Sequence, residues 1–156
     1  MTEAHPRHRG AMSGAVPYFG LRMNADSRTK FINVDLDLRG ARDLADLVRA
    51  FEPGASPLTC MELDGGYFAN LELASQPPDA DTAIRGFVAL IDQLSPEARA
   101  LWNEASTRDF SIGVGAGSTP SSFELALEPA VLKLAADVGA RIVFVVYVYA
   151  QESATS

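Results

Sequence analysis

The residues of this chain best placed to do chemistry lie in one short stretch, FINVDLDL, at positions 31–38. In an extended strand, side chains two positions apart share a face, so Asn33, Asp35 and Asp37 form one polar row opposite the apolar residues between them. Two carboxylates this close could bind Mg²⁺ or Ca²⁺ if further oxygen ligands converged from other strands. Two alone do not make a metal site, and no local feature desolvates either one, as a paired-carboxylate hydrolase requires. Their spacing also resembles a metal-nucleotide motif of glycosyltransferases, but the chain is too small for that fold.

Other residue types that commonly carry catalysis are scarce. The two histidines, His5 and His8, precede the first regular pattern, so the part predicted to fold has no imidazole to act as a general base or a metal ligand. The single cysteine, Cys60, lies inside a strand pattern without a cationic neighbour in sequence, so we expect a packing residue rather than a nucleophile. We therefore predict no catalytic residue, no bound metal and no cofactor, and the sequence leans against an enzyme.

A glycine-rich segment, GVGAG at positions 113–117, is the one stretch that resembles a phosphate loop. It lacks the Lys-Ser/Thr pair of a P-loop and the spacing of a dinucleotide-binding turn. Alternation along a strand places Gly113, Gly115 and Gly117 on one face and leaves that face bare. We expect the close approach of another backbone or a bulge there, in preference to ligand access.

The elements that position these residues follow from the periodicity of the apolar side chains. Residues 1–28 show no period and predict a flexible N-terminal tail. After the 31–38 strand, a helical stripe ends at Pro53 and Gly54. Strands at 58–63 and 67–73, joined by a short turn of Asp and Gly, predict a β-hairpin. Two helical segments follow, with candidate N-terminal caps at Asp79 or Asp81 and at Ser95.

The remaining pattern completes the fold prediction. It predicts strands at 109–117 and 123–127, a helix from Pro129 to Val138 closed by Gly139, and a last strand at 141–149. Because the last strand is apolar on both faces, we predict that it lies centrally in the sheet. The order β-α-β-β-α-β-β-α-β predicts a single α+β domain at 29–150, with a flexible C-terminal tail at 151–156. We predict a two-layer sandwich with a mixed sheet of 5–6 strands and helices mainly on one face.

Applying the alternation to every strand predicts a composite polar face on the side of the sheet away from the helices. If Ile32, Val34 and Leu36 face the helices, the row on the first strand faces the opposite side, together with every second residue of the 67–73 and 141–149 strands. Aromatic rings beside acids suit a cationic protein surface or a small polar ligand. A solvated face with aromatic cross-strand pairs is the alternative without a function. The candidate binding residues are Asn33, Asp35, Asp37, Phe68, Asn70, Glu72, Tyr147 and Tyr149.

Charge and hydropathy limit the partners. The net charge is −7, and residues 1–30 hold five bases against two acids, so the remaining 126 residues carry −10. Such an acidic domain repels the phosphates of nucleic acids, and we predict no nucleic-acid partner. No apolar run approaches the roughly 18 residues of a membrane span, and the N-terminus lacks the order of a secretory signal. We therefore expect a cytoplasmic protein with no membrane partner.

Four phrases of the sequence resemble an uncharacterised bacterial family of small α/β domains, a domain of unknown function. They are NVDLDL, DADTAIRGFVALIDQL, DFSIGVGAG and LEPAVLKLAADVGARIVFVVY, and the likeness covers roughly residues 29–149. None of them is a catalytic signature. Members of such families often resemble accessory proteins of toxin and defence loci, including immunity proteins, and the resemblance implies a role of that kind.

Three functional hypotheses follow from the sequence. The first is a non-enzymatic binding module, of the immunity or accessory type, that binds a cationic protein partner through the acidic, aromatic sheet face. The second is a small-molecule sensor or small enzyme that uses the carboxylates and tyrosines of the same face. The third is a homodimer formed through the last strand.

Overall fold

A computed structural model describes residues 28–148 of the chain and confirms the predicted α+β class. The predicted tails at 1–28 and 151–156 lie outside the described residues, except for Arg28, which bridges to Thr119. Five strands form one mixed sheet in the order β2-β3-β1-β4-β5. The elements are β1 (Lys30–Gly40), α1 (Ala45–Ala50), β2 (Ala55–Leu63), β3 (Gly66–Leu73), α2 (Ala80–Asp92), α3 (Pro96–Glu104), β4 (Thr107–Ala116), α4 (Pro129–Asp137) and β5 (Arg141–Val148).

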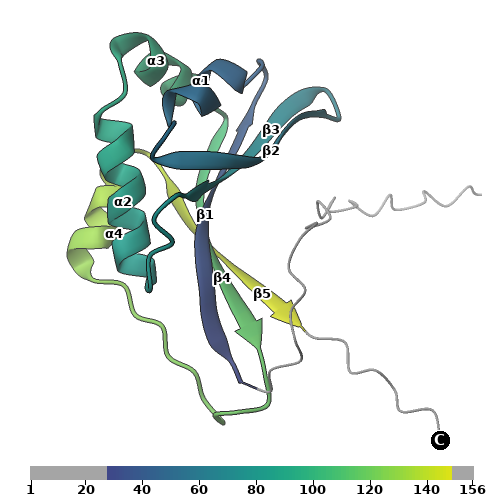
Figure 1. The fold of residues 1–156 in the computed structure, drawn as a ribbon, viewed down its shortest axis with the longest axis vertical. Helices are drawn as coiled ribbons and strands as arrows, with labels where there is room; N and C mark the ends of the chain where they lie inside the picture. Colours follow the sequence, from purple (N-terminus) through teal and green to yellow (C-terminus); the bar gives the residue numbers. More distant parts are fainter. Residues whose placement is uncertain (1–27, 149–156) are drawn as a thin grey trace, which may run out of the picture.

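The central strand is β1, which pairs antiparallel with β3 on one side and β4 on the other. The β2-β3 hairpin adds β2 beyond β3, and β5 runs parallel to β4 after the α4 crossover. In Figure 1 the helices α2 and α4 cover one face of this sheet. The polar row of β1 therefore lies in the middle of the opposite face.

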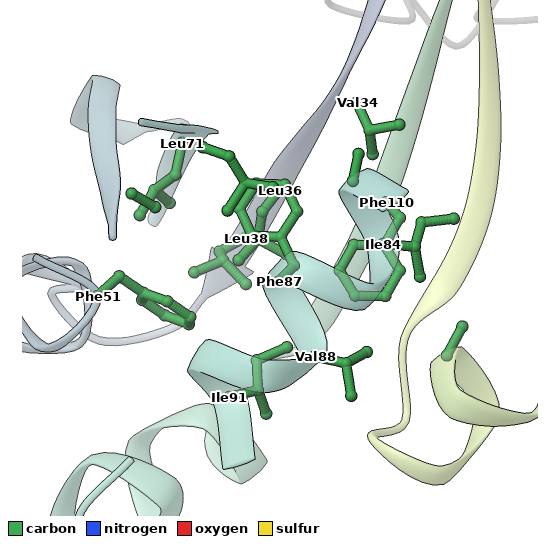
Figure 2. Close-up of a cluster of buried hydrophobic side chains, with 14 of the residues drawn as sticks. Val34, Leu36, Leu38, Phe51, Leu71, Ile84, Phe87, Val88, Ile91 and Phe110 are labelled. Atoms are coloured by element: carbon green, nitrogen blue, oxygen red, sulfur yellow. The ribbon is translucent and has the colours of Figure 1, made fainter. Parts of the chain in front are cut away.

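One hydrophobic core joins the sheet to the helices. Phe87 of α2 is fully buried and stacks on Phe110 of β4, with ring centroids 5.8 Å apart. Figure 2 shows the side chains of α2 directed at those of β1 and β4. The helical spacing in α2 and the alternation in β1 are the two apolar periods that build this interface. Its principal members are Val34, Leu36, Leu38, Leu71, Ile84, Phe87, Val88, Ile91, Phe110 and Ile112.

Local signals fix the ends of the elements as the sequence predicts. The carboxylate of Asp79 accepts a hydrogen bond from the Thr82 amide at 2.7 Å and caps α2. This bond lowers the pKa of Asp79, because the charged form is the better acceptor. Gly139 follows α4 with a positive φ of 71°. In the β2-β3 turn, Asp64 and Gly65 both adopt positive φ, as a tight hairpin of this kind requires.

The predicted central position of the last strand is wrong. β5 lies at the edge of the sheet and pairs, among residues 28–148, only with β4. The centre is taken by β1, because both β3 and β4 hydrogen-bond to it. As a result, Phe144, Val146 and Val148 stay exposed, although they are apolar.

Three further predictions are corrected. The 123–127 segment forms no strand and runs as irregular chain between β4 and α4. Ile32 does not join the helix face. A bulge between Phe31 and Asn33 brings the Ile32 Cβ to 3.5 Å from where a Cβ of Gly113 would lie, on the polar side. Cys60 is exposed and does not pack in the core, because β2 is the second edge strand.

No helix within residues 28–148 is long and apolar enough to cross a membrane.

Candidate functional site

The sheet register brings the predicted polar residues of β1 and β3 together. Asp37 lies directly opposite Asn70, and Asp35 lies opposite Glu72 on β3. On the other side of β1, Asp35 lies opposite Ser111 of β4. Because paired residues of adjacent strands share a face, the side chains of all five point away from the helices. We call Asn33, Asp35, Asp37, Asn70 and Ser111 the polar ladder.

Hydrogen bonds connect the polar ladder from end to end. Asn33 Nδ2 donates to Asp35 Oδ1 at 2.9 Å, and Ser111 Oγ donates to Asp37 Oδ2 at 2.6 Å. Between them, Asn70 Nδ2 donates to Asp37 Oδ1 at 2.6 Å and to Asp35 Oδ2 at 3.4 Å. Each of the four carboxylate oxygens thus accepts a side-chain hydrogen bond, and the Asn70 amide bridges the two aspartates.

The middle of the polar ladder is buried, whereas its ends are partly open. Asp35 is 2% exposed and Asn70 is 4% exposed, and Ser111 is also buried. Asn33 and Asp37 are half-buried. Buried carboxylates need hydrogen-bond donors, because removing a charge from water is costly. The polar ladder therefore has a clear structural role. Of its two aspartates, Asp37 is the one that a partner could reach.

Negative charge is concentrated around the polar ladder. Asp35 lies opposite Glu72, and Asp37 lies opposite Asp109, so two acid pairs face each other across neighbouring strands. Arg141 of β5 neutralises one of the four acids, with its Nε and Nη2 each 2.7 Å from the Asp109 carboxylate. This bidentate contact raises the pKa of Arg141. Among residues 28–148, no cation or hydrogen-bond donor contacts the half-buried Glu72 carboxylate.

The aromatic members of the predicted face lie at its two sides. Phe68 of β3 faces the polar side as predicted, but it is buried, and the Arg39 guanidinium lies 5.0 Å from its ring centroid. Tyr147 of β5 also faces the polar side, where it lies alongside Gly113. Tyr149 lies outside the described residues.

The glycine face of β4 is not bare. A Cβ added to Gly113 would lie 2.7 Å from Asn33 Oδ1 and 3.3 Å from Tyr147 Cε2. Side chains of β1 and β5 therefore use the space that the missing Cβ leaves, next to the bulge of β1. The expected bulge is present, and the expected close approach comes from side chains rather than from backbone.

Gly113→Ala should destabilise the protein through this contact. The added methyl group would push the Asn33 side chain away from Asp35, and overpacking of this kind lowers the free energy of unfolding by about 1–3 kcal/mol. Urea denaturation followed by circular dichroism measures the change.

A double-mutant cycle provides the control for Gly113. In an Asn33→Ala background the closest obstacle is gone, so Gly113→Ala should cost clearly less than in the native background. An equal cost in both backgrounds would show that Asn33 is not the group that requires a glycine here.

Ser111 and Arg39 belong to this face but are missing from the predicted set. Ser111 lies two positions before Gly113, and Arg39 lies two positions after Asp37, so the same alternation places both on the polar side. The signal was present in the sequence for both residues. What it does not contain is the pairing of Ser111 with Asp37, which depends on the register between β1 and β4.

Other candidate sites in the described part of the chain are poorly equipped for chemistry. Within residues 28–148, no three His, Cys, Asp or Glu side chains gather to hold a metal ion. Partial desolvation, together with the negative charge of Asp43, raises the pKa of the Cys60 thiol, which disfavours the nucleophilic thiolate. A shallow pocket of about 300 Å³ lies by the start of α2, but its Asp79 and Asp81 carboxylates already accept backbone hydrogen bonds.

Comparisons with known proteins give no relative. No protein-family model matches the chain, and no curated protein or solved structure matches it significantly. The resemblance to a bacterial domain family stays a prediction, and the case for a function depends on the polar face itself.

Proposed function

We propose that this protein is a non-enzymatic binding module whose polar sheet face binds a cationic protein partner. The observation that carries the proposal is the concentration of four carboxylates on three neighbouring strands, where Asp35 faces Glu72 and Asp37 faces Asp109. Like charges directly opposite each other destabilise a sheet. A protein that keeps such pairs gives up stability, and a cationic partner would recover it.

Glu72 and Asp37 are the residues through which this partner would bind. Both are half-buried, so they are partly desolvated before binding and still accessible. Glu72 has no cation beside it among the described residues, whereas Asp109 is held by Arg141. An incoming Lys or Arg would therefore meet Glu72 first. Hydrogen bonds hold the polar ladder beside them in place, which favours a preorganised surface over one that rearranges around a substrate.

The same hydrogen bonds explain why the geometry does not favour the sensor or enzyme hypothesis. A catalytic or ligand-binding carboxylate needs an oxygen directed at its target. Asp35 is buried, and both of its oxygens are already held by Asn33 and Asn70, so the two aspartates cannot act together on one ligand. A cationic protein surface needs only the more accessible Asp37 and Glu72.

Co-expression with the products of neighbouring genes tests the proposal. We expect a basic protein to copurify with the tagged full chain and its retention to fall steeply as salt rises, because screening weakens exposed charge pairs. Glu72→Lys should reduce the retained partner at least tenfold, by placing a positive charge where a positive group must bind.

Glu62→Lys is the matched control. Glu62 lies on β2 opposite Tyr67, and both residues are on the helix side of the sheet. The same charge reversal therefore occurs in the same hairpin but on the other face. It should leave copurification unchanged. The proposal fails if no neighbouring product binds, or if Glu62→Lys weakens binding as much as Glu72→Lys.

A further inference from the structure

Within the described residues 28–148, β5 is an edge strand whose outer side pairs with no other strand. All eight residues of the strand pair with β4 in an unbroken register, from Asp109↔Arg141 to Ala116↔Val148. The strand contains no proline, and after Arg141 it contains no charged residue. Edges of this kind invite pairing with another strand, and natural proteins normally blunt them with charges, prolines or bulges.

The opposite edge of the sheet has these protections. β2 contains Pro57 and a register shift between Pro57 and Thr59, and Glu62 lies near its end. The contrast within one sheet shows that the two edges are built differently. The composition of β5 is typical of a strand that is paired on both sides.

Exposed apolar side chains accompany the open edge. Phe144 is 54% exposed, Val146 is 57% exposed and Val148 is 81% exposed. All three lie on the helix side of the sheet, in register with the buried Ile112 and Val114. Figure 1 shows α4 beside the start of β5, whereas the end of the strand extends beyond the helices. This stretch is an apolar patch beside a backbone edge that pairs with no second strand of residues 28–148.

We propose that the occupant of this edge is a second copy of the same chain, which pairs antiparallel through β5 about a two-fold axis at Val145. In this register Phe144 lies opposite Val146 of the second copy, and Tyr147 lies opposite Val143 of the second copy. Both aromatic residues thus meet a β-branched residue, which is a favourable cross-strand pair. Ile142 lies opposite Val148 of the second copy, so the most exposed residue is covered as well.

Charge and symmetry favour a second copy over a different protein. A two-fold axis requires the strand to be complementary to itself, and the register about Val145 satisfies this on both faces at once. No acid lies in the strand, so no two acids face each other across the proposed contact. Each Arg141 lies at an end of the paired region and is already bound by Asp109 of its own chain.

The mass of the full chain in solution is the first test. Light scattering and sedimentation velocity should give twice the chain mass of 16.7 kDa, with dissociation on dilution. Phe144→Lys and Val146→Glu should each abolish the dimer at concentrations where the native chain is dimeric. A monomer at every concentration, or a dimer unaffected by either variant, overturns the proposal.

Mixing the two variants tests the register. In the mixed pair, the lysine at position 144 of one chain meets the glutamate at position 146 of the other, and the second site keeps its native Phe144 and Val146. The mixture should therefore form a heterodimer although neither variant pairs with itself. Leu58→Lys, on the β2 edge at 47% exposure, is the matched control and should leave the dimer intact.

A cysteine variant tests the axis without a charged substitution. In a Cys60→Ser background, Val145→Cys should give a disulfide-linked dimer on mild oxidation, because the two copies of this residue face each other at about 4.5–5.5 Å between Cα atoms. Val143→Cys is the control on the same face. Its two copies lie four strand residues apart, about 13 Å, and should not link. Equal linking at both positions would contradict this register.

Discussion

Asn70→Leu should lower the free energy of unfolding by about 2–4 kcal/mol, because it removes the one amide that bridges Asp35 and Asp37. Leucine keeps much of the volume of the side chain but donates no hydrogen bond. Asp35 and Asp37 would each lose a donor next to a second acid, Glu72 or Asp109. Chemical denaturation with circular dichroism measures the loss.

Two comparisons isolate the cause of this effect. Asn103→Leu makes the same change at an exposed position of α3 and should stay within about 0.5 kcal/mol of the native protein. In an Asp37→Asn background, Asn70→Leu should cost less, because the acceptor that loses its partner is then neutral. An unchanged cost in that background would show that Asn70 acts through packing, not through the aspartates.

Trp102→Ala should be more damaging still, with a loss of about 3–5 kcal/mol in the free energy of unfolding. Trp102 of α3 is fully buried, and its ring lies edge-on to Phe51 at 6.2 Å between centroids. Its Nε1 donates to the Val138 carbonyl at the end of α4, and Arg108 of β4 lies 5.8 Å from its ring. One side chain therefore joins α1, α3, α4 and the sheet.

Trp102→Phe separates packing from hydrogen bonding at this position. Both variants leave the Val138 carbonyl without its donor, but phenylalanine keeps an aromatic ring in the core. Trp102→Phe should therefore lower the free energy of unfolding clearly less than Trp102→Ala. Thermal and urea unfolding by circular dichroism suits both variants, since Trp102 is the only tryptophan and the native fluorescence signal is lost with it. Equal losses for alanine and phenylalanine would mean that the hydrogen bond, and not the cavity, dominates.

Local patterns in the sequence determined most of the fold, because each depends on neighbouring residues only. The spacing of Ile84, Phe87 and Ile91 predicts the buried face of α2, and the alternation around Asp35 predicts the two faces of β1. Turn and cap residues act within a few positions, so the hairpin turn and the N-terminal caps of α2 and α3 are found where they are predicted.

The order of the strands was not determined locally, and here the tertiary structure decided the outcome. An apolar strand such as β5 can lie at the centre of a sheet or at an edge that another chain covers, and its sequence looks the same in both cases. Which of the two occurs depends on β1, which takes both β3 and β4 as partners and leaves β5 outside.

In the polar ladder, the sequence determines the face on which each side chain lies, and the tertiary structure decides which atoms it contacts. Alternation alone placed Asn33, Asp35 and Asp37 in a row, and it would have placed Ser111 on the same side. The sequence could not show that Asn70 bridges two aspartates or that Asp37 faces Asp109, because both depend on the register between strands that are 33 or more residues apart in the chain. Hydrogen-bond partners across a sheet are set by that register, and it is fixed only when the whole core packs.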